Sequence, residues 1–152
     1  MSIAARLKEL GITLPDAPKP VANYVPAVQA GNLVFVSGQV SAAGGAAVKG
    51  KLGADVSLED GQKAARLCAL AILAQVNAAV GSLDKVKRVV KLGGFVACTP
   101  EFDQHPAVVN GASDLMVEVF GDKGKHARFA VGVPSLPLGF AVEVDAVVEV
   151  EG

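Results

Sequence analysis

The sequence predicts an α+β domain in which two helices cover one face of a mixed β-sheet. Between His126 and Val150, apolar residues alternate with charged or small ones in two runs, which Leu136-Pro137-Leu138-Gly139 separates. Alternation with a period of two residues indicates β-strands. An Ala- and Leu-rich stretch between Ser57 and Gly81 has the spacing of a long amphipathic helix. After a short N-terminal helix the predicted order is ββ(β)αβαββ, which favours a mixed sheet with its helices on one side.

The composition indicates a single domain over residues 1–152 and gives no sign of an electrostatic partner. Apolar residues make up 51% of the chain and aromatic residues 5%, so the core must consist of Val, Ala and Leu. Fourteen basic and 15 acidic residues give a net charge of -1. We therefore expect no binding to nucleic acid or to an anionic membrane.

The cysteines and the apolar runs predict a soluble cytoplasmic protein. Cys68 and Cys98 lie in apolar stretches without a second Cys or a His at metal-ligand spacing, so we expect buried free thiols and no metal site. No long apolar run follows the N-terminus. The run from Leu67 to Val80 is interrupted by Gln75 and Asn77, and we expect it to be too short to cross a bilayer.

The first third of the chain is expected to hold an extension and a hairpin. Residues 1–20 predict a short helix, capped by Ser2, and a Pro-rich linker. The runs 24–30 and 33–36 flank Gly31-Asn32 and predict a hairpin with a two-residue turn. Ser37-Gly38-Gln39 then indicates a bulge or a close approach of another backbone, and residues 48–52 a short third strand.

The remaining elements follow from caps and breaks in the pattern. Ser57 and Gly81 bound the longest helix, and residues 86–98 form a strand with a bulge or kink at Gly93-Gly94. A second helix begins near His105-Pro106 and stops at Gly121. The last two strands are expected to pair with each other as a hairpin.

The uncovered face of the sheet is expected to be apolar. The residues predicted to lie there include Ala130, Gly132, Ala141 and Val147. Large apolar patches are rare on monomers, so this face predicts an oligomer.

Two motifs carry a resemblance to a known family. GN, a hydrophobic run and SGQ extend from Gly31 to Gln39, and AR-x-x-V-x-V-x-x-LP-x-G-x-x-VEVDA extends from Ala127 to Ala146. Together with the long helix between them, they resemble the RidA (YjgF/endoribonuclease L-PSP) family of reactive enamine/imine deaminases. The resemblance covers nearly the whole chain from about Tyr24 onward.

The resemblance implies a chorismate-mutase-like fold, assembled as a homotrimer with clefts between neighbouring subunits. It implies hydrolysis of 2-imino acids to 2-keto acids and ammonia, without a metal or an organic cofactor. Arg128 would bind the substrate carboxylate and Glu143 would help to place the attacking water. The residues matching Tyr24, Ser37 and Asn110 would line the cleft beside Gly38 and Ala130.

The sequence departs from the family pattern beside these positions. Many members carry Cys where this chain has Ala130, and the Tyr usually follows Gly-Pro, whereas Tyr24 follows Ala22-Asn23. The N-terminal helix and the loop from Thr99 to Pro106 look like additions. A non-catalytic trimer that binds a small carboxylate or keto acid is therefore an alternative, and an endoribonuclease is a weaker one because no basic groove is evident.

Each candidate residue also has a structural explanation. Arg128 could form an ion pair with Glu143 or Asp145 across the terminal hairpin, although the small residues around it favour a binding pocket. Glu143 could be a solvated strand carboxylate, and Tyr24 could be ordinary packing. His105 and His126 are interpreted as surface or capping residues.

Overall fold

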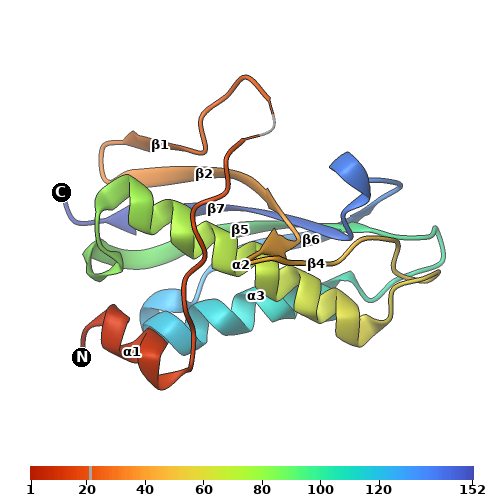
Figure 1. Cartoon of the computed structure of the whole chain (residues 1–152), viewed down its shortest axis with the longest axis horizontal. Helices are drawn as coiled ribbons and strands as arrows, with labels where there is room; N and C mark the ends of the chain where they lie inside the picture. Colours follow the sequence, from red (N-terminus) through yellow and green to blue (C-terminus); the bar gives the residue numbers. More distant parts are fainter. Residues whose placement is uncertain (21) are drawn as a thin grey trace.

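The computed structural model describes residues 1–20 and 22–152 and has five strands in one mixed sheet (Figure 1). The order across the sheet is β1-β2-β7-β5-β6. Neighbouring strands are antiparallel except β5 and β6, which run parallel. The bounds are β1 Ala27–Ala30, β2 Leu33–Val40, β5 Val86–Ala97, β6 Ala127–Val133 and β7 Val142–Val150.

Two long helices, α2 (Leu58–Val80) and α3 (His105–Phe120), pack together on one face of this sheet (Figure 1). Helix α2 contacts β2 and β7, whereas α3 contacts β5 and β6. The Ser57 side chain caps α2, and Gly81 ends it in a left-handed conformation. The predicted α+β class, the two helices and their caps are confirmed. Short 3₁₀ turns η1 (Leu83–Lys85), η2 (Gly121–Gly124) and η3 (Pro137–Gly139) complete the connections.

Helix α2 is longer than the apolar run that the sequence suggested. Among the described residues it is the one helix that could span a membrane by length and composition alone, yet 56% of its most apolar window is buried inside the domain. Cys68, Ile72 and Val76 on its inner face belong to the core. A core helix with this packing explains the hydropathy.

The predicted N-terminal hairpin is confirmed, with a shorter first strand. Residues of β1 pair with β2 across the Gly31-Asn32 turn. The pairing of β2 with β7 shifts register between Val36 and Gln39, which is the bulge expected at Ser37-Gly38. The strand predicted over residues 48–52 is wrong. A small hairpin of β3 (Ala42–Ala43) and β4 (Ala46–Ala47) forms before it, and Lys49 and Leu52 make only isolated bridges.

The terminal pair of strands does not form the predicted hairpin. Strand β5 lies between β6 and β7, and the connection between the last two strands passes the end of β5. The Ala97 amide donates to the carbonyl of Ala141, and the Cys98 amide donates to the carbonyl of Val133. The end of β5 and the residue after it therefore pair with the chain on both sides, in the place where β6 and β7 would pair with each other in a hairpin. An ion pair from Arg128 across such a hairpin is excluded with it.

The predicted bulge at Gly93-Gly94 is also wrong. Both residues keep their register with β6 and β7, and the irregularities of β5 lie nearer its start. A Cβ at Gly94 would lie 2.7 Å from a methyl group of Val109 on α3, and one at Gly93 would lie 2.6 Å from Cζ of Phe129. These glycines make room for neighbouring side chains and do not bend the strand.

The uncovered face of the sheet carries both apolar and charged side chains. Of the four residues expected there only Val147 lies on it, on the same face of β7 as Glu143, Asp145 and Glu149. Ala141 is fully buried, Ala130 packs against the core, and Gly132 lies against Cys98 and His105. Phe35, Val28 and Val131 are 45%, 52% and 43% exposed. On the same face Phe95 and Phe129 pack edge to face, with ring centroids 5.3 Å apart. The strand alternation was read correctly, but β6 presents its larger side chains away from the helices.

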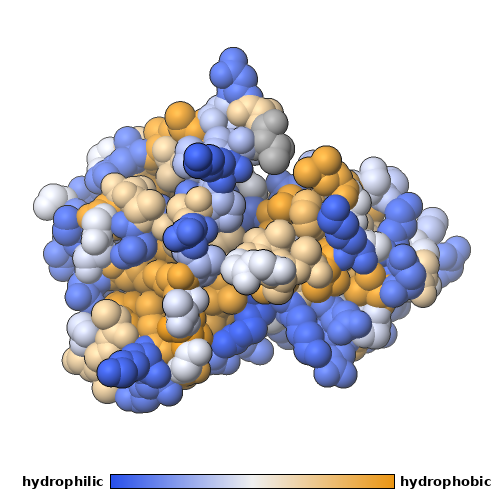
Figure 2. Space-filling view, in the orientation of Figure 1, coloured by the Kyte–Doolittle hydropathy of each residue, from blue (hydrophilic) through white to orange (hydrophobic). Residues whose placement is uncertain are grey.

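The N-terminal extension is fastened to the domain by hydrogen bonds. Helix α1 (Ile3–Glu9) lies beside α3 and η1 (Figure 1). The Arg6 Nε donates to the carbonyl of Glu118, and the Ile3 amide donates to Asp84. Farther along, the Gln75 side chain donates to the carbonyl of Pro18. Figure 2 shows hydrophobic and hydrophilic residues interspersed over this side of the molecule.

Candidate functional site

Arg128 lies on the edge strand β6 and is oriented by α3. Its Nη1 donates to Oδ1 of Asn110 at 2.8 Å and to Oγ of Ser113 at 3.1 Å. Its Nη2 lies 3.4 Å from the carbonyl oxygen of Pro106. Asn110 and Ser113 are three residues apart on a helix, so both side chains project toward the same strand. Three neutral acceptors thus fix one side of the guanidinium.

Ser113 and His126 form a second layer behind this arginine. The Ser113 hydroxyl lies 2.8 Å from Nε2 of His126, whose Nδ1 lies 2.6 Å from the carbonyl oxygen of Gly124. The serine accepts from Arg128, so its own proton is free to be donated to Nε2. The Nδ1–H tautomer of His126 satisfies every group in this chain. His126 therefore supports the serine that orients Arg128, a role that sequence spacing did not indicate.

The guanidinium has no acidic partner in the part of the chain that the structure describes. Arginine has five N–H donors and stays charged at all relevant pH values. The three contacts use donors of the two terminal nitrogens only. The remaining donors and the uncompensated positive charge make this a candidate site for a carboxylate.

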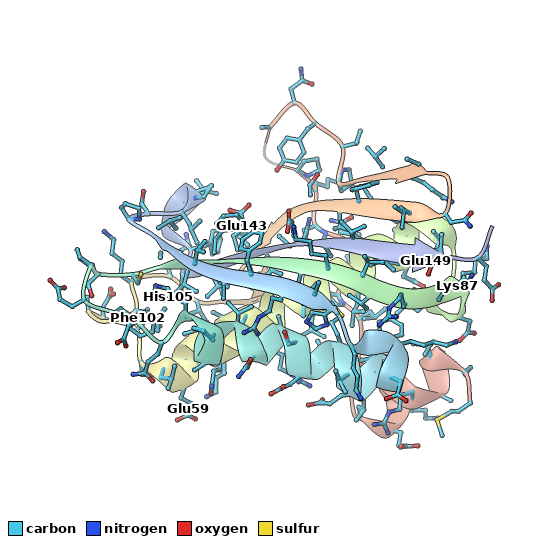
Figure 3. The ribbon with its side chains drawn as sticks, turned by 180° about the vertical axis from the view of Figure 1, so that it is seen from behind. Glu59, Lys87, Phe102, His105, Glu143 and Glu149 are labelled. Carbon is cyan, nitrogen blue, oxygen red and sulfur yellow. The ribbon has the colours of Figure 1, made fainter. Side chains whose placement is uncertain are left out.

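Glu143 belongs to a different part of the molecule, on the uncovered face of β7 (Figure 3). It is half-buried, and burial followed by the nearby Asp145 carboxylate raises its pKa. A Cβ at Gly38 would overlap the Glu143 carboxylate and would lie 2.9 Å from its Cδ. The absence of a side chain at Gly38, in the bulge of β2, therefore gives Glu143 its position.

Tyr24, Ser37 and Gly38 gather on the same side as Glu143. The Ser37 hydroxyl donates to the carbonyl of Val25 at 2.8 Å, which ties β2 to the segment that carries Tyr24. Tyr24 and Gly38 line one cavity of about 230 Å³, together with Leu138 and Phe140. Tyr24 is 47% exposed there. The structure thus brings four of the predicted residues into one region.

Within one chain the two groups are separated by most of the sheet. Strands lie about 4.8 Å apart, so β6 is roughly 10 Å from β7, which carries Glu143, and roughly 14 Å from β2, which carries Ser37 and Gly38. Arg128 also faces α3, whereas Glu143 lies on the uncovered face. Ala130 follows Arg128 on the same face of β6, and its small side chain packs against the core. One subunit therefore carries Arg128 at one edge of the sheet and Glu143 on its central strand, with Ser37, Gly38 and Tyr24 beyond it toward the other edge.

The described residues contain no cluster of three or more His, Cys, Asp or Glu side chains that could hold a metal ion. The site that the geometry defines is an arginine on the edge of an α+β sheet, held by neutral acceptors and without an acidic partner among the described residues. Ser113 is the functional contact that the sequence did not indicate, since a lone Ser in a helix carries no motif.

Comparisons with known proteins agree with this class. A family model described as "YjgF/chorismate_mutase-like, putative endoribonuclease" matches residues 4–150. Protein TCP17 of Trypanosoma cruzi is 52% identical over 97% of this chain and 93% of its own. A 2-iminobutanoate/2-iminopropanoate deaminase of Dermatophagoides farinae is 31% identical over 92% of this chain and 95% of its own. The crystal structure of Atu1372 from Agrobacterium tumefaciens has a TM-score of 0.91, with 54% identity over 98% of this chain and 92% of that one.

The chain belongs to the YjgF/RidA family. This confirms the resemblance drawn from the motifs around Ser37-Gly38 and Arg128.

Proposed function

We propose that the protein hydrolyses reactive 2-imino and enamino acids to 2-keto acids and ammonia, in clefts between the subunits of a homotrimer. Water adds to the C=N carbon, the C–N bond breaks, and the nitrogen leaves as ammonia. The observation that carries the proposal is the Arg128 guanidinium, which three neutral acceptors hold and no acid neutralises among the described residues. The name of the 31% identical deaminase supports the same reaction class.

The carboxylate of the substrate would supply the negative partner that the Arg128 guanidinium lacks among the described residues. A guanidinium binds a carboxylate through two parallel N–H···O bonds, and these fix the plane of the substrate as well as its position. Asn110 and Ser113 hold the arginine beforehand, so little side-chain entropy is lost on binding. Fixing the carboxylate fixes the adjacent imine carbon at a defined place.

A trimer would bring the two separated groups together. A heterologous interface that closes on itself joins one edge of each copy to a different surface of the next. The edge with Arg128 of one copy would then face the region of Tyr24, Ser37 and Glu143 of its neighbour. The apolar part of the uncovered face, with Phe35 and Val131 partly exposed, supplies surface for such an assembly.

Glu143 would accept a proton from the attacking water. Its pKa is raised by burial, and a carboxylate with a raised pKa is a stronger base than one in water. The low intrinsic barrier of imine hydrolysis means that one placed carboxylate and one anchored substrate suffice. Gly38 keeps the space beside this carboxylate open.

The test measures ammonia released from freshly generated 2-iminobutyrate. Arg128→Ala is expected to lower kcat/KM by about 100-fold or more, the scale of losing a charge-assisted carboxylate contact. Arg128→Lys should recover only part of that loss because an ammonium cannot form the fork. Arg88→Ala is the matched control, since Arg88 on β5 contacts the carbonyl of Lys125 and lies outside the site.

Sedimentation of each variant checks that the assembly is intact. Unchanged turnover by an assembled Arg128→Ala protein would remove this residue from the mechanism. If the wild type sediments as a monomer, the proposal of a cleft shared between subunits is refuted.

Ala130 favours a second candidate function, a trimer that binds a keto acid without turnover. The position lies next to Arg128 on the same face of β6 and offers only a methyl group, where the family pattern led us to expect a thiol. Thermal stabilisation by 2-ketobutyrate that depends on Arg128, without ammonia release, would identify this function.

A further inference from the structure

A cavity at the end of the sheet holds a cysteine and a histidine that the proposed reaction does not use. It has a volume of about 670 Å³, and Lys51, Cys98, Thr99, Phe102, His105 and Gly132 are among the residues lining it. That volume is within the range of sites for small ligands. Arg128, Tyr24 and Glu143 do not line it. The cavity borders the Arg128 site without sharing these side chains, since His105 precedes Pro106, whose carbonyl oxygen contacts Arg128.

Cys98 and His105 are in contact within this cavity. The Sγ of Cys98 lies 3.4 Å from Nε2 of His105, within the hydrogen-bond distance for sulfur. The expectation that both cysteines are buried thiols is correct for Cys68, which is fully buried, and wrong for Cys98, which is partly exposed. A thiol beside an imidazole is the arrangement that activates cysteine nucleophiles.

The surrounding residues hold this pair in place. The rings of Phe102 and His105 meet edge to face, with centroids 5.4 Å apart, and lie together where β5 leads into α3 (Figure 3). A Cβ at Gly132 would lie 2.5 Å from Nε2 of His105 and 2.7 Å from Sγ of Cys98. A methyl group at Gly132 would therefore displace both side chains, which are free to shift because the atoms in its way belong to side chains and not to the backbone.

The electrostatics of the cavity require a proton acceptor and favour an anionic ligand. Burial raises the pKa of the Cys98 thiol, against the lowering effects of the Val133 backbone and of Lys51. The thiol therefore keeps its proton at neutral pH and needs His105 to remove it. Lys51 and His105 are the titratable groups lining the cavity besides Cys98. No acid pairs with the Lys51 ammonium in the described part of the chain.

We infer that this cavity is a thiol site for a small carbon electrophile that carries a carboxylate. Cys98 is the nucleophile, His105 accepts the thiol proton, and Lys51 attracts the carboxylate. With a haloacetate the S–C bond forms as the C–I bond breaks. Iodide leaves with the electron pair, and the proton passes from Sγ to His105 and then to water.

The experiment compares iodoacetate and iodoacetamide, two probes that differ in charge, on the native full-length protein at pH 7. Intact-mass spectrometry is expected to find one adduct, at Cys98, and Cys98→Ser should abolish it. Cys68 is an internal control, because a fully buried thiol reacts only on unfolding. His105→Gln should slow both probes by at least about tenfold, the lower end of what a positioned base contributes.

Two further variants separate the roles. Gly132→Ala keeps both side chains but displaces them, so it should slow labelling even if His105→Gln does not fold. Lys51→Met should lower the ratio of iodoacetate to iodoacetamide rates while leaving the iodoacetamide rate unchanged. Equal labelling rates in wild type and His105→Gln, or no adduct at Cys98, would overturn the inference. A probe ratio equal to that of glutathione, and unaffected by Lys51→Met, would overturn the preference for a carboxylate.

Discussion

Replacing Gly111 by Ala tests how closely α2 and α3 must approach for the anchor site to form. A Cβ at this position would overlap the backbone carbonyl oxygen of Gln62 and lie 2.9 Å from its carbonyl carbon. The obstacle is backbone, so no side chain can rotate away and the two helices must separate. Gly111 lowers helix propensity in the middle of α3, and the close approach of the α2 backbone explains why it is there.

The magnitude follows from two opposing terms. Alanine in a helix interior is favoured over glycine by about 1 kcal/mol. Overpacking a core contact costs about 1–3 kcal/mol, and rigid backbone on both sides places this case near ~3 kcal/mol. We therefore expect a net loss of about 2 kcal/mol of unfolding free energy, or a fall of roughly 4–8 °C in Tm for a domain of this size.

Urea and thermal denaturation measure this loss, with Gly61→Ala as the matched control. A Cβ at Gly61 meets a methyl carbon of Leu52 at 2.8 Å, which is a side-chain atom that can shift. Its destabilisation should be smaller than that of Gly111→Ala. Equal or higher stability of Gly111→Ala relative to the wild type would refute the reasoning, because only the helix-propensity gain would then be acting.

Two further predictions concern Glu143. The pKa of Glu143 is raised on folding, so the folded state binds the proton more tightly than the unfolded state does. The stability gained from this proton is fully present below about pH 4.3, the pKa of an unperturbed Glu. It is lost as the pH rises through the pKa of Glu143 in the folded state. Glu143→Gln should therefore be more stable than the wild type at pH 7, with an advantage that shrinks toward pH 4 in urea titrations, and a constant difference would contradict the burial of this carboxylate. Gly38→Ala should displace the flexible carboxylate, lowering ammonia release with little change in Tm; full activity would show that the position of Glu143 does not matter.

The helices and the first hairpin could be predicted because their signals are local. Ser57 and Gly81 bound α2 through hydrogen bonds and a left-handed residue that neighbouring sequence determines. The Gly31-Asn32 turn likewise sets the register of β1 and β2 without help from the rest of the chain.

The partners of β6 and β7 could not be predicted in the same way. Alternation shows that both are strands but carries no information about which strand lies between them. The choice depends on the parallel pairing of β5 with β6, which joins residues about 35 positions apart, such as Leu92 and Arg128. The wrong strand pairing affected the prediction for the site, because the structural alternative for Arg128 was an ion pair with an acid across that hairpin.

The sequence patterns could not predict the contacts around Arg128 and Cys98 either. Ser113 and His105 belong to α3, and their relation to β6 depends on how the helix crosses the sheet. Neither residue has a spacing that a motif would specify. The motif around Arg128 gave the position of the anchor but not the neutral groups that hold it.

Small residues let α3 lie close enough to β6 to contribute to two sites, the one at Arg128 and the cavity that holds Cys98. Gly94 admits Val109 against the sheet, Gly111 admits the backbone of α2, and Gly132 admits the ring of His105. Each of these contacts lets α3 lie closer to its neighbours than larger side chains would allow. Only at that distance can short side chains such as Asn110 and Ser113 reach the guanidinium of Arg128. The low aromatic content of the chain is therefore a condition for the anchor site, because a core of bulkier residues would move the helix out of hydrogen-bonding range.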